Sequence, residues 1–243
     1  MVLNEKINVR AVLFDYDDTI MDVSEARNYA RQVIAYELSS ITNFDQDHIL
    51  GVIKDVEIRM ESVGQFDRRI WFKEVAKALN VELSIDEINK LVRVYWDSWR
   101  LRSRLFPDVM PTLSELRRCG FRLGIVTNTD GESGLKRGRI RRDGIDEFFD
   151  LIVVAGDDTK YVKPHPEPFI RALHILGMPG NEVIYIGDRV STDVPGPKAV
   201  GMYVGIIKRY NSLNTGDIND NINPKPDFII NSLFELLRIL ECL

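Results

Sequence analysis

A short apolar run near the start of the chain is followed at once by clustered carboxylates. Residues 12–14 combine β-branched, aliphatic and aromatic side chains, a pattern that predicts a buried strand. Asp15, Asp17 and Asp18 follow within four positions. Like charges so close raise each other's pKa, and a bound cation, a basic partner or exposure on a turn would relieve that cost. This stretch alone therefore leaves a functional site and a polar turn equally open.

The hydrophobic spacing changes to the helical period after Thr19. Four successive segments repeat apolar residues every three or four positions, and no convincing strand interrupts them between about residues 22 and 104. The pattern predicts a small helical bundle that forms a separate all-α domain. Ser84 and Glu87 have the spacing of a capping box at the start of the fourth helix. The apolar positions that mark the four helices are Ala30, Ile34, Leu38 and Ile41, then Ile49, Val52, Ile53, Val56 and Met60, then Trp71, Val75, Ala78 and Leu79, and finally Ile88, Leu91, Val92, Tyr95 and Trp99.

From Pro107 onward, strand-like and helix-like segments alternate. This alternation predicts a parallel sheet with helices on both of its faces. Ser232 and Glu235 suggest a second capping box, which would open a C-terminal helix. Residues 209–226 are rich in Asn, Gly and Pro and predict a long surface loop. The strands are expected at 121–126, 151–155, 183–186, 202–207 and 228–230, and further helices at 111–120, within 131–144, at 169–177 and at 197–200.

Polar side chains stand at the ends of three of these strands. Asp15 and Asp17 follow the first strand, Thr127 and Asn128 follow the next, and Asp188 follows a third. In open parallel sheets, ligands bind at the carboxyl ends of the strands. We therefore expect these residues to meet along one edge. The chain leaves the predicted sheet at the same edge to form the helical segment, which could therefore cover the site as a lid.

The residue types at this edge suit phosphoryl transfer. A carboxylate can attack phosphorus and form an aspartyl-phosphate, while a second one exchanges protons with the leaving oxygen and the attacking water. Mg²⁺ prefers carboxylate oxygens, which Asp15 and Asp188 can supply, with Asp193 nearby. Lys163 and Thr127 could hold the non-bridging oxygens of the phosphate.

Four short motifs occur in a fixed order along the chain, and together they resemble the signature motifs of the haloacid dehalogenase (HAD) superfamily. The resemblance is to its phosphatase-type hydrolases and spans about residues 10–207. The helical insertion after the first motif is similar to the cap of members that carry it between the first and second motifs. The motifs are Asp15-Tyr16-Asp17-Asp18-Thr19, Val126-Thr127-Asn128, Val162-Lys163-Pro164 and Gly187-Asp188-Arg189-Val190-Ser191-Thr192-Asp193.

The resemblance implies a role for each carboxylate. Asp15 would be the nucleophile and Asp17 the general acid and base. Mg²⁺ would be held by Asp15, the main-chain carbonyl of Asp17 and Asp188. Asp193 would complete the metal site by ordering a metal-bound water or the lysine.

The resemblance also implies the phosphate site and the domain boundaries. Thr127 and Lys163 would bind the substrate phosphate, with Asn128 beside them. The expected fold is α/β, with a Rossmann-like parallel sheet core formed by residues 1–21 and 105–243. A small all-α cap domain would comprise residues 22–104.

Composition and net charge limit the classes of binding partner and the cellular location that we expect. The 243 residues are 44% hydrophobic and carry a net charge of −5, which argues against non-specific binding to nucleic acid or to an acidic membrane. Cys119 and Cys242 lack the spacing of a zinc site or a disulfide framework, so we expect a cytoplasmic protein. Five cations fall within residues 136–142. We interpret them as a solvated face, with binding of a substrate or polyanion as the less favoured alternative.

The expected function is a Mg²⁺-dependent phosphatase that hydrolyses a small phosphorylated metabolite through an aspartyl-phosphate. A phosphomutase, a phosphonate hydrolase and a 2-haloacid dehalogenase of the same fold remain open, although Asp17 counts against the dehalogenase. A phosphometabolite-binding regulatory protein is the non-enzyme alternative, and the presence of Asp15 and Lys163 counts against it. The physiological substrate and the oligomeric state cannot be predicted from the sequence.

Overall fold

The chain forms two compact units in a computed structural model that describes residues 8–209 and 223–242. The first unit comprises the chain up to Met21, then Leu105–Thr129, and the chain from Ser133 onward. The second comprises Asp22–Arg104 and Asp130–Glu132. Most of the surface loop expected at 209–226 lies outside the described residues.

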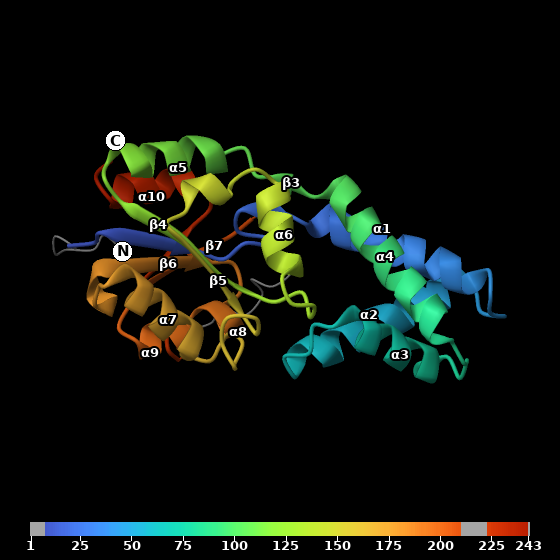
Figure 1. The fold of residues 1–243 in the computed structure, drawn as a ribbon. Coiled ribbons are helices and arrows are strands. Elements are labelled where there is room, and N and C mark those ends of the chain that lie inside the picture. Colours follow the sequence, from blue (N-terminus) through green and yellow to red (C-terminus); the bar gives the residue numbers. More distant parts are fainter. Residues whose placement is uncertain (1–7, 210–222, 243) are drawn as a thin grey trace. The chain divides into compact units, whose positions relative to one another are not determined.

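Six parallel strands form the centre of the first unit (Figure 1). Neighbouring strands are parallel throughout, and most of their residues are buried, because helices cover both faces of such a sheet. The predicted Rossmann-like α/β fold is confirmed, and each predicted strand is present. Their order across the sheet is β5 (Leu151–Ala155), β4 (Arg122–Asn128), β1 (Ala11–Phe14), β6 (Val183–Gly187), β7 (Tyr203–Ile207) and β8 (Phe228–Ile230).

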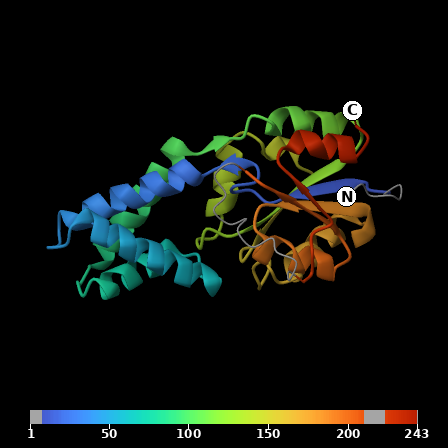
Figure 2. The same ribbon diagram turned by 180° about the vertical axis from the view of Figure 1, so that it is seen from behind.

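Helices lie on both faces of this sheet. α5 (Val109–Arg118) and α10 (Leu233–Ile239) lie side by side on one face, and α7 (Glu167–Leu176) and α9 (Pro195–Ala199) lie on the other (Figures 1 and 2). α9 begins two residues earlier than expected, because Pro195 is favoured in the first turn of a helix. Among the described residues of this unit, the remaining helical segments are α6 (Leu135–Arg142), α8 (Val190–Asp193) and two single turns at Asp146–Phe148 and Gly180–Glu182.

The start of α10 differs from the predicted capping box. Ser232 Oγ accepts a hydrogen bond from the Phe234 amide at 3.2 Å, and Glu235 Oε1 accepts one from the Asn231 amide at 3.1 Å. The Ser232 hydroxyl itself lies 2.9 Å from Asp108 Oδ2, just before α5. The cap of α10 therefore uses different hydrogen-bond partners from those that the sequence spacing predicted.

The second unit consists of four helices, at the places where the periodicity predicted them. They are α1 (Ser24–Ser39), α2 (Gln46–Ser62), α3 (Arg68–Ala78) and α4 (Ile85–Arg102). The capping box at the start of α4 is confirmed, because the Glu87 amide donates to Ser84 Oγ at 3.3 Å and the Ser84 amide donates to Glu87 Oε2 at 2.7 Å.

Ile41 was wrongly assigned to the first predicted helix. Ile41 lies beyond the end of α1 and is 53% exposed. Ser39 and Ser40 end the helix, and their hydroxyls donate to the carbonyls of Tyr36 and Glu37. Side chains that bond to the local backbone compete with helix continuation, so the period did not extend to Ile41.

Two very short strands mark the boundaries between the units. β2 (Met21–Asp22) and β3 (Arg104–Leu105) form a two-stranded sheet where the chain leaves the first unit and returns to it. Strands of two residues have no detectable periodicity, which is why the sequence did not indicate them. No helix within the described ranges is long and apolar enough to span a membrane.

Candidate active site

The first unit brings the predicted strand-end residues together. β1 is hydrogen-bonded to β4 on one side and to β6 on the other, with Phe14 in register with Ile125 and Ile186. Asp15 continues from β1, and its amide donates to the Ile186 carbonyl at 2.8 Å. Because all three strands run in the same direction, the residues that follow them share one edge of the sheet.

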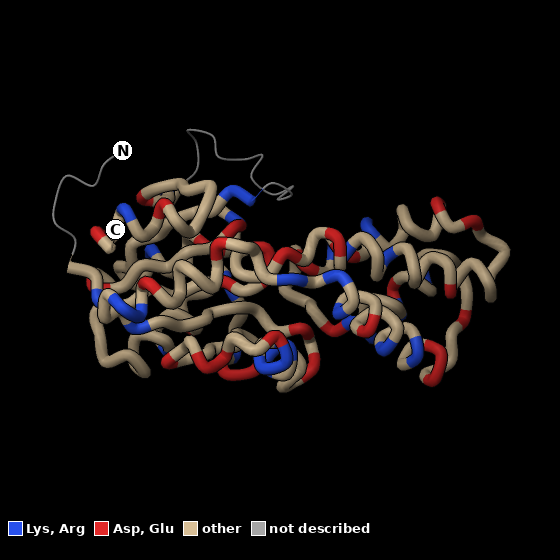
Figure 3. The backbone as a smooth tube through the Cα atoms, turned by 90° about the horizontal axis from the view of Figure 1, so that it is seen from above, with Lys and Arg blue, Asp and Glu red and all other residues tan. Residues whose placement is uncertain are grey.

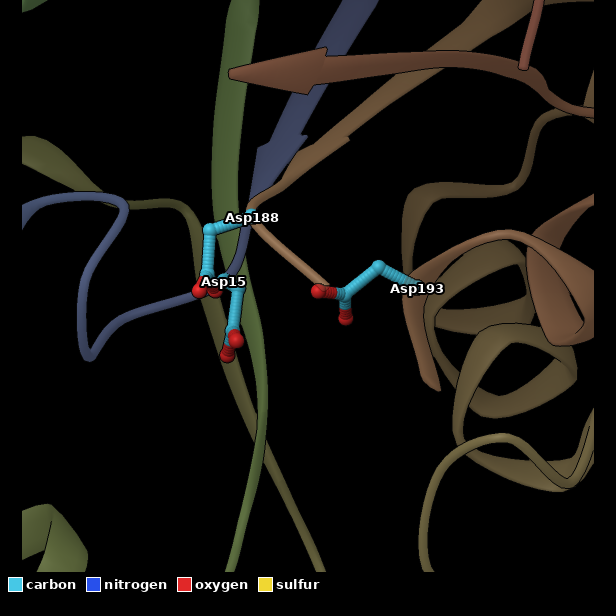
Figure 4. A group of neighbouring side chains, drawn as sticks. All are labelled: Asp15, Asp188 and Asp193. Carbon is cyan, nitrogen blue, oxygen red and sulfur yellow. The ribbon is translucent and has the colours of Figure 1, made fainter. Parts of the chain in front are cut away.

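Three buried carboxylates converge at this edge. Asp15, Asp188 and Asp193 offer oxygens that lie within 4.8 Å of one another. Figure 4 shows the carboxylate of Asp193 pointing toward the other two. Gly187 makes this approach possible, because a Cβ at that position would lie 2.4 Å from Asp193 Cγ. The cluster therefore depends on a residue without a side chain immediately before Asp188.

The carboxylates of this cluster fit a hard cation. Asp188 is 1% exposed, and its Oδ2 atom has no hydrogen-bond partner. Burial, followed by the charges of Asp18 and Asp193, raises the pKa of Asp188 well above its usual value. Burial also raises the pKa of Asp15, although Lys163 opposes the shift. A divalent cation would offset both the burial and the repulsion, and carboxylate oxygens are the ligands that Mg²⁺ prefers.

Lys163 supplies a positive charge next to the Asp15 carboxylate. Its Nζ lies 2.9 Å from Asp15 Oδ1 and 2.7 Å from Asp193 Oδ1. Burial alone would lower the pKa of Lys163, but the two carboxylates outweigh it and raise the pKa. Lys163 is therefore an ammonium, and its positive charge suits the binding of phosphate oxygens.

Tyr185 is a site residue that the sequence interpretation missed. Its hydroxyl lies 2.8 Å from Lys163 Nζ, 3.0 Å from Asp193 Oδ1 and 3.1 Å from the Val126 carbonyl. Burial, followed by the charge of Asp193, raises the pKa of Tyr185 well above its usual value, so the hydroxyl stays protonated. A tyrosine within an apolar strand predicts only a core residue, and its ring does pack against Phe169.

The two remaining residues that were predicted to bind phosphate, Thr127 and Asn128, lie at the end of β4. Thr127 is 3% exposed near the end of the strand. Asn128 uses its side chain to hold the backbone of Lys163, because Oδ1 accepts from the Lys163 amide at 2.8 Å and Nδ2 lies 3.5 Å from the Lys163 carbonyl. The geometry thus gives Asn128 contacts to the lysine's backbone.

Asp17 points toward a different set of partners. Its carboxylate is ion-paired with Lys136, and Arg139 reaches Oδ1 at 2.6 Å. Burial alone would raise the pKa of Asp17, but Arg139 and then Lys136 outweigh it and hold the pKa well below its usual value. Asp17 is therefore ionised in this arrangement. It can accept a proton directly, whereas it would first have to gain one in order to act as an acid.

The cations of α6 do not all form the solvated face that their sequence run suggested. Lys136 and Arg139 are each 3% exposed, so that interpretation is wrong for these two residues. They are three positions apart, which places both on the side of the helix that contacts Asp17. Arg141 and Arg142 are exposed, as expected.

A second buried ion pair supports the loop after Asp17. Arg209 NH2 donates to the Thr19 carbonyl at 2.7 Å, while NH1 lies 2.8 Å from Asp108 Oδ2. Asp108 also accepts from the Leu233 amide at 2.8 Å, at the start of α10. No sequence signal links these residues, because Asp108 and Arg209 are far apart in the chain and belong to none of the four motifs.

Comparison with known proteins shows what this chain resembles over its whole length. It is 30% identical over 238 residues to the glyceraldehyde 3-phosphate phosphatase of Methanopyrus kandleri, covering 96% of this chain and 97% of the relative. It is 27% identical over 248 residues to the phosphoglycolate phosphatase of Salmonella paratyphi A, covering 98% of this chain and 95% of the relative. The magnesium-bound crystal structure of YfnB from Bacillus subtilis is 25% identical, covers 96% of this chain and 98% of its own, and superposes with a TM-score of 0.71.

A family model agrees with these relatives. The model described as haloacid dehalogenase-like hydrolase matches residues 9–201, which include all four motifs. The curated relatives are phosphatases, which supports the prediction of a hydrolase that acts on phosphate monoesters. The chain therefore belongs to the haloacid dehalogenase-like hydrolases.

Proposed function

We propose that this protein is a Mg²⁺-dependent phosphatase of small phosphorylated metabolites, with Asp15 as its nucleophile. The observation that carries the proposal is the pairing of Asp15 with Asp188 at the sheet edge. Asp188 has a buried oxygen without a hydrogen-bond partner, and Lys163 Nζ lies 2.9 Å from Asp15. This combination offers a nucleophile, a cation site and an anion site within one cluster.

The remaining residues have roles that follow from their contacts. Asp15 would attack phosphorus and break the bond between phosphorus and the ester oxygen. That oxygen would take a proton from Asp17, once this carboxylate has gained one, and leave as the alcohol. Lys163 and Thr127 would hold the phosphate oxygens, and Asn128 would position Lys163 through its backbone. Asp17, ionised beside Arg139, would take the proton of the water that hydrolyses the aspartyl-phosphate.

Magnesium would be held by Asp15, Asp188 and the main-chain carbonyl of Asp17. When bound, the ion offsets the negative charge that the phosphate brings to the carboxylates. The magnesium-bound structure of the relative YfnB supports this choice of ion. Asp193, which lies 2.7 Å from Lys163 Nζ, would orient the lysine.

The relatives suggest the size and charge of the substrate. Their names indicate glyceraldehyde 3-phosphate and phosphoglycolate, both short phosphate monoesters. We propose a substrate of the same class for this chain. We also propose that the helical unit, residues 22–104, acts as a cap domain that selects the substrate. The cytoplasmic location and the absence of nucleic-acid or membrane partners remain predictions.

The proposal is tested by turnover of p-nitrophenyl phosphate, glyceraldehyde 3-phosphate and phosphoglycolate. We expect hydrolysis with Mg²⁺, none with EDTA, and loss of turnover in Asp15→Asn. Asp188→Asn should raise the Mg²⁺ concentration needed for half-maximal activity about tenfold or more, since it removes a charged ligand. Exposed Asp47→Asn is the matched control. Full activity of Asp15→Asn would remove the nucleophile assignment, and transfer of phosphate to a sugar instead of water would indicate a mutase.

A further inference from the structure

Helix α6 is attached to the loop that carries the proposed nucleophile. Lys136, Arg139 and Asp143 follow one another at intervals of three and four residues, so they occupy one side of the helix and its C-terminal end. Each of them contacts a residue of the loop between Asp15 and Thr19. In Figure 3, α6 is seen end-on as a coil in which Lys and Arg are concentrated.

Both oxygens of the Asp17 carboxylate are engaged by this helix. Arg139 contacts Oδ1 with NH2 at 2.6 Å and Oδ2 with NH1 at 3.3 Å. Lys136 Nζ pairs with Oδ2 as well. The two cations are almost completely buried, so water screens these contacts only weakly. A planar guanidinium that contacts both oxygens of a carboxylate fixes the orientation of that carboxylate as well as its distance.

The neighbouring Tyr16 strengthens the same attachment. Its ring is fully buried, with Lys136 Nζ 5.9 Å and Arg139 Cζ 5.6 Å from the ring centroid. Its hydroxyl donates to Asp143 at the end of α6. Tyr16, between the two carboxylates of the first motif, thus supports both cations, which hold the Asp17 carboxylate one residue further on.

We propose that Lys136 and Arg139 are positioning residues that fix the carboxylate of Asp17 for proton transfer. The inference rests on the proposed phosphatase function and extends it to residues outside the four motifs. Proton transfer requires the carboxylate within hydrogen-bond reach of the reacting oxygen, and a displacement of about 1 Å can reduce turnover about a hundredfold. Without its two partners, the Asp17 side chain would rotate freely in a loop that otherwise keeps its fold.

The test is a double-mutant cycle between Arg139 and Asp17, measured as kcat and KM for p-nitrophenyl phosphate with saturating Mg²⁺. Arg139→Gln should lower kcat about ten- to a hundredfold and leave KM within about twofold. In an Asp17→Asn background the same substitution should change kcat less than about twofold, because its effect passes through Asp17. Lys136→Met should behave in the same way, and Arg139→Lys should recover part of the loss.

The matched control is Arg142→Gln, an exposed cation on the same helix, which should leave both parameters unchanged. A full additional loss of kcat in the Asp17→Asn background would overturn the proposal. So would a rise in KM at constant kcat, which would indicate that the cations bind an anionic group of the substrate.

A stability cycle separates failure of this inference from failure of the proposed function. Arg139→Gln should lower the urea midpoint of the wild-type protein but not that of Asp17→Asn, whose pairing is already weakened. A wild-type protein that hydrolyses no phosphate ester would overturn the function, and with it the catalytic purpose of the pair. Equal midpoint shifts in both backgrounds would overturn the pairing itself.

Discussion

Lys163 is held by charged and polar side chains on several sides. Its ammonium lies between Asp15 and Asp193, with the Tyr185 hydroxyl as a third neighbour. A buried lysine of this kind is held in one rotamer, so it presents its charge at a fixed point. Phosphate binding would then cost little reorganisation, which is the condition under which electrostatic stabilisation contributes most to catalysis.

The Tyr185 hydroxyl can be removed without removing its ring. Tyr185→Phe should retain the packing on Phe169 while Lys163 and Asp193 each lose a hydrogen-bond partner. We expect a loss of about 1–2 kcal/mol in the free energy of unfolding. We also expect kcat to fall several-fold. Urea unfolding and steady-state kinetics measure the two effects.

The control for this variant is Tyr203→Phe. Tyr203 lies on the adjacent strand β7, in register with Ile184, toward the end of the sheet away from the cluster. The Tyr203→Phe substitution should leave kcat unchanged. If Tyr185→Phe were as active and as stable as the wild type, the hydroxyl would have no part in holding the lysine.

The sequence predicted those site residues that belong to short motifs at strand ends. Asp15 and Asp188 could be placed together because both follow apolar runs, and Lys163 because its motif comes shortly before a predicted helix. Tyr185 could not, since its hydroxyl contacts depend on which strands are neighbours. Lys136 was hidden in a run of charges that ordinarily faces solvent.

At the scale of elements, the loop after Asp17 is held from two directions. α6 contacts it through Lys136 and Arg139, and Arg209 contacts it at the Thr19 carbonyl. Arg209 is in turn paired with Asp108, which joins the starts of α5 and α10. These tertiary contacts fix a segment whose backbone does not pair with the strands of the six-stranded sheet.

The Asp108 pair makes a testable contribution to stability. Burial opposes the ionised form, but Arg209 outweighs it and lowers the pKa of Asp108. A carboxyl whose pKa is lowered by folding stabilises the native state above its unfolded pKa of about 3.9, and this contribution is lost as the pH falls through the folded pKa. Asp108→Asn should therefore cost about 3 kcal/mol near pH 7.

The measurement is urea unfolding of the wild type and Asp108→Asn at several pH values. The difference in unfolding free energy should shrink steadily as the pH falls below about 3.9. Exposed Asp47→Asn should show no such difference. A difference that is independent of pH would mean that the charge of Asp108 does not contribute.

Element positions were more predictable than the contacts between elements. The alternation from Pro107 onward gave the sheet, because parallel strands buried on both faces are continuous apolar runs. The cap of α10 was predicted with the wrong partners, since Ser232 Oγ accepts from the Phe234 amide while its hydroxyl donates to Asp108, which is far away in the sequence. Ile41 fitted a helical period but lies after the two serines that end α1. Sequence spacing describes one element at a time and does not include such competition.

At the scale of the whole molecule, the two units can be followed separately. All three tryptophans, Trp71, Trp96 and Trp99, belong to the helical unit. The carboxylates Asp15 and Asp188 belong to the other unit. Tryptophan fluorescence therefore reports one unit, while circular dichroism reports both.

Magnesium should stabilise the two units unequally. Ligand binding stabilises the native state that binds it, by about 2.7 kcal/mol at a hundred times the dissociation constant. We expect Mg²⁺ to raise the thermal midpoint of the circular dichroism transition more than that of tryptophan fluorescence. Asp188→Asn should abolish the difference. Equal shifts by both probes would show that the units unfold as one.

The most direct test of the central claim is to trap the covalent intermediate. The protein is mixed with excess substrate and Mg²⁺, quenched in acid within the first turnovers, and digested for mass spectrometry. We predict a phosphoryl group on the peptide that contains Asp15, absent from Asp15→Asn. Rapid release of phosphate with no modified peptide, or a phosphoryl group on a peptide that lacks Asp15, would contradict this account.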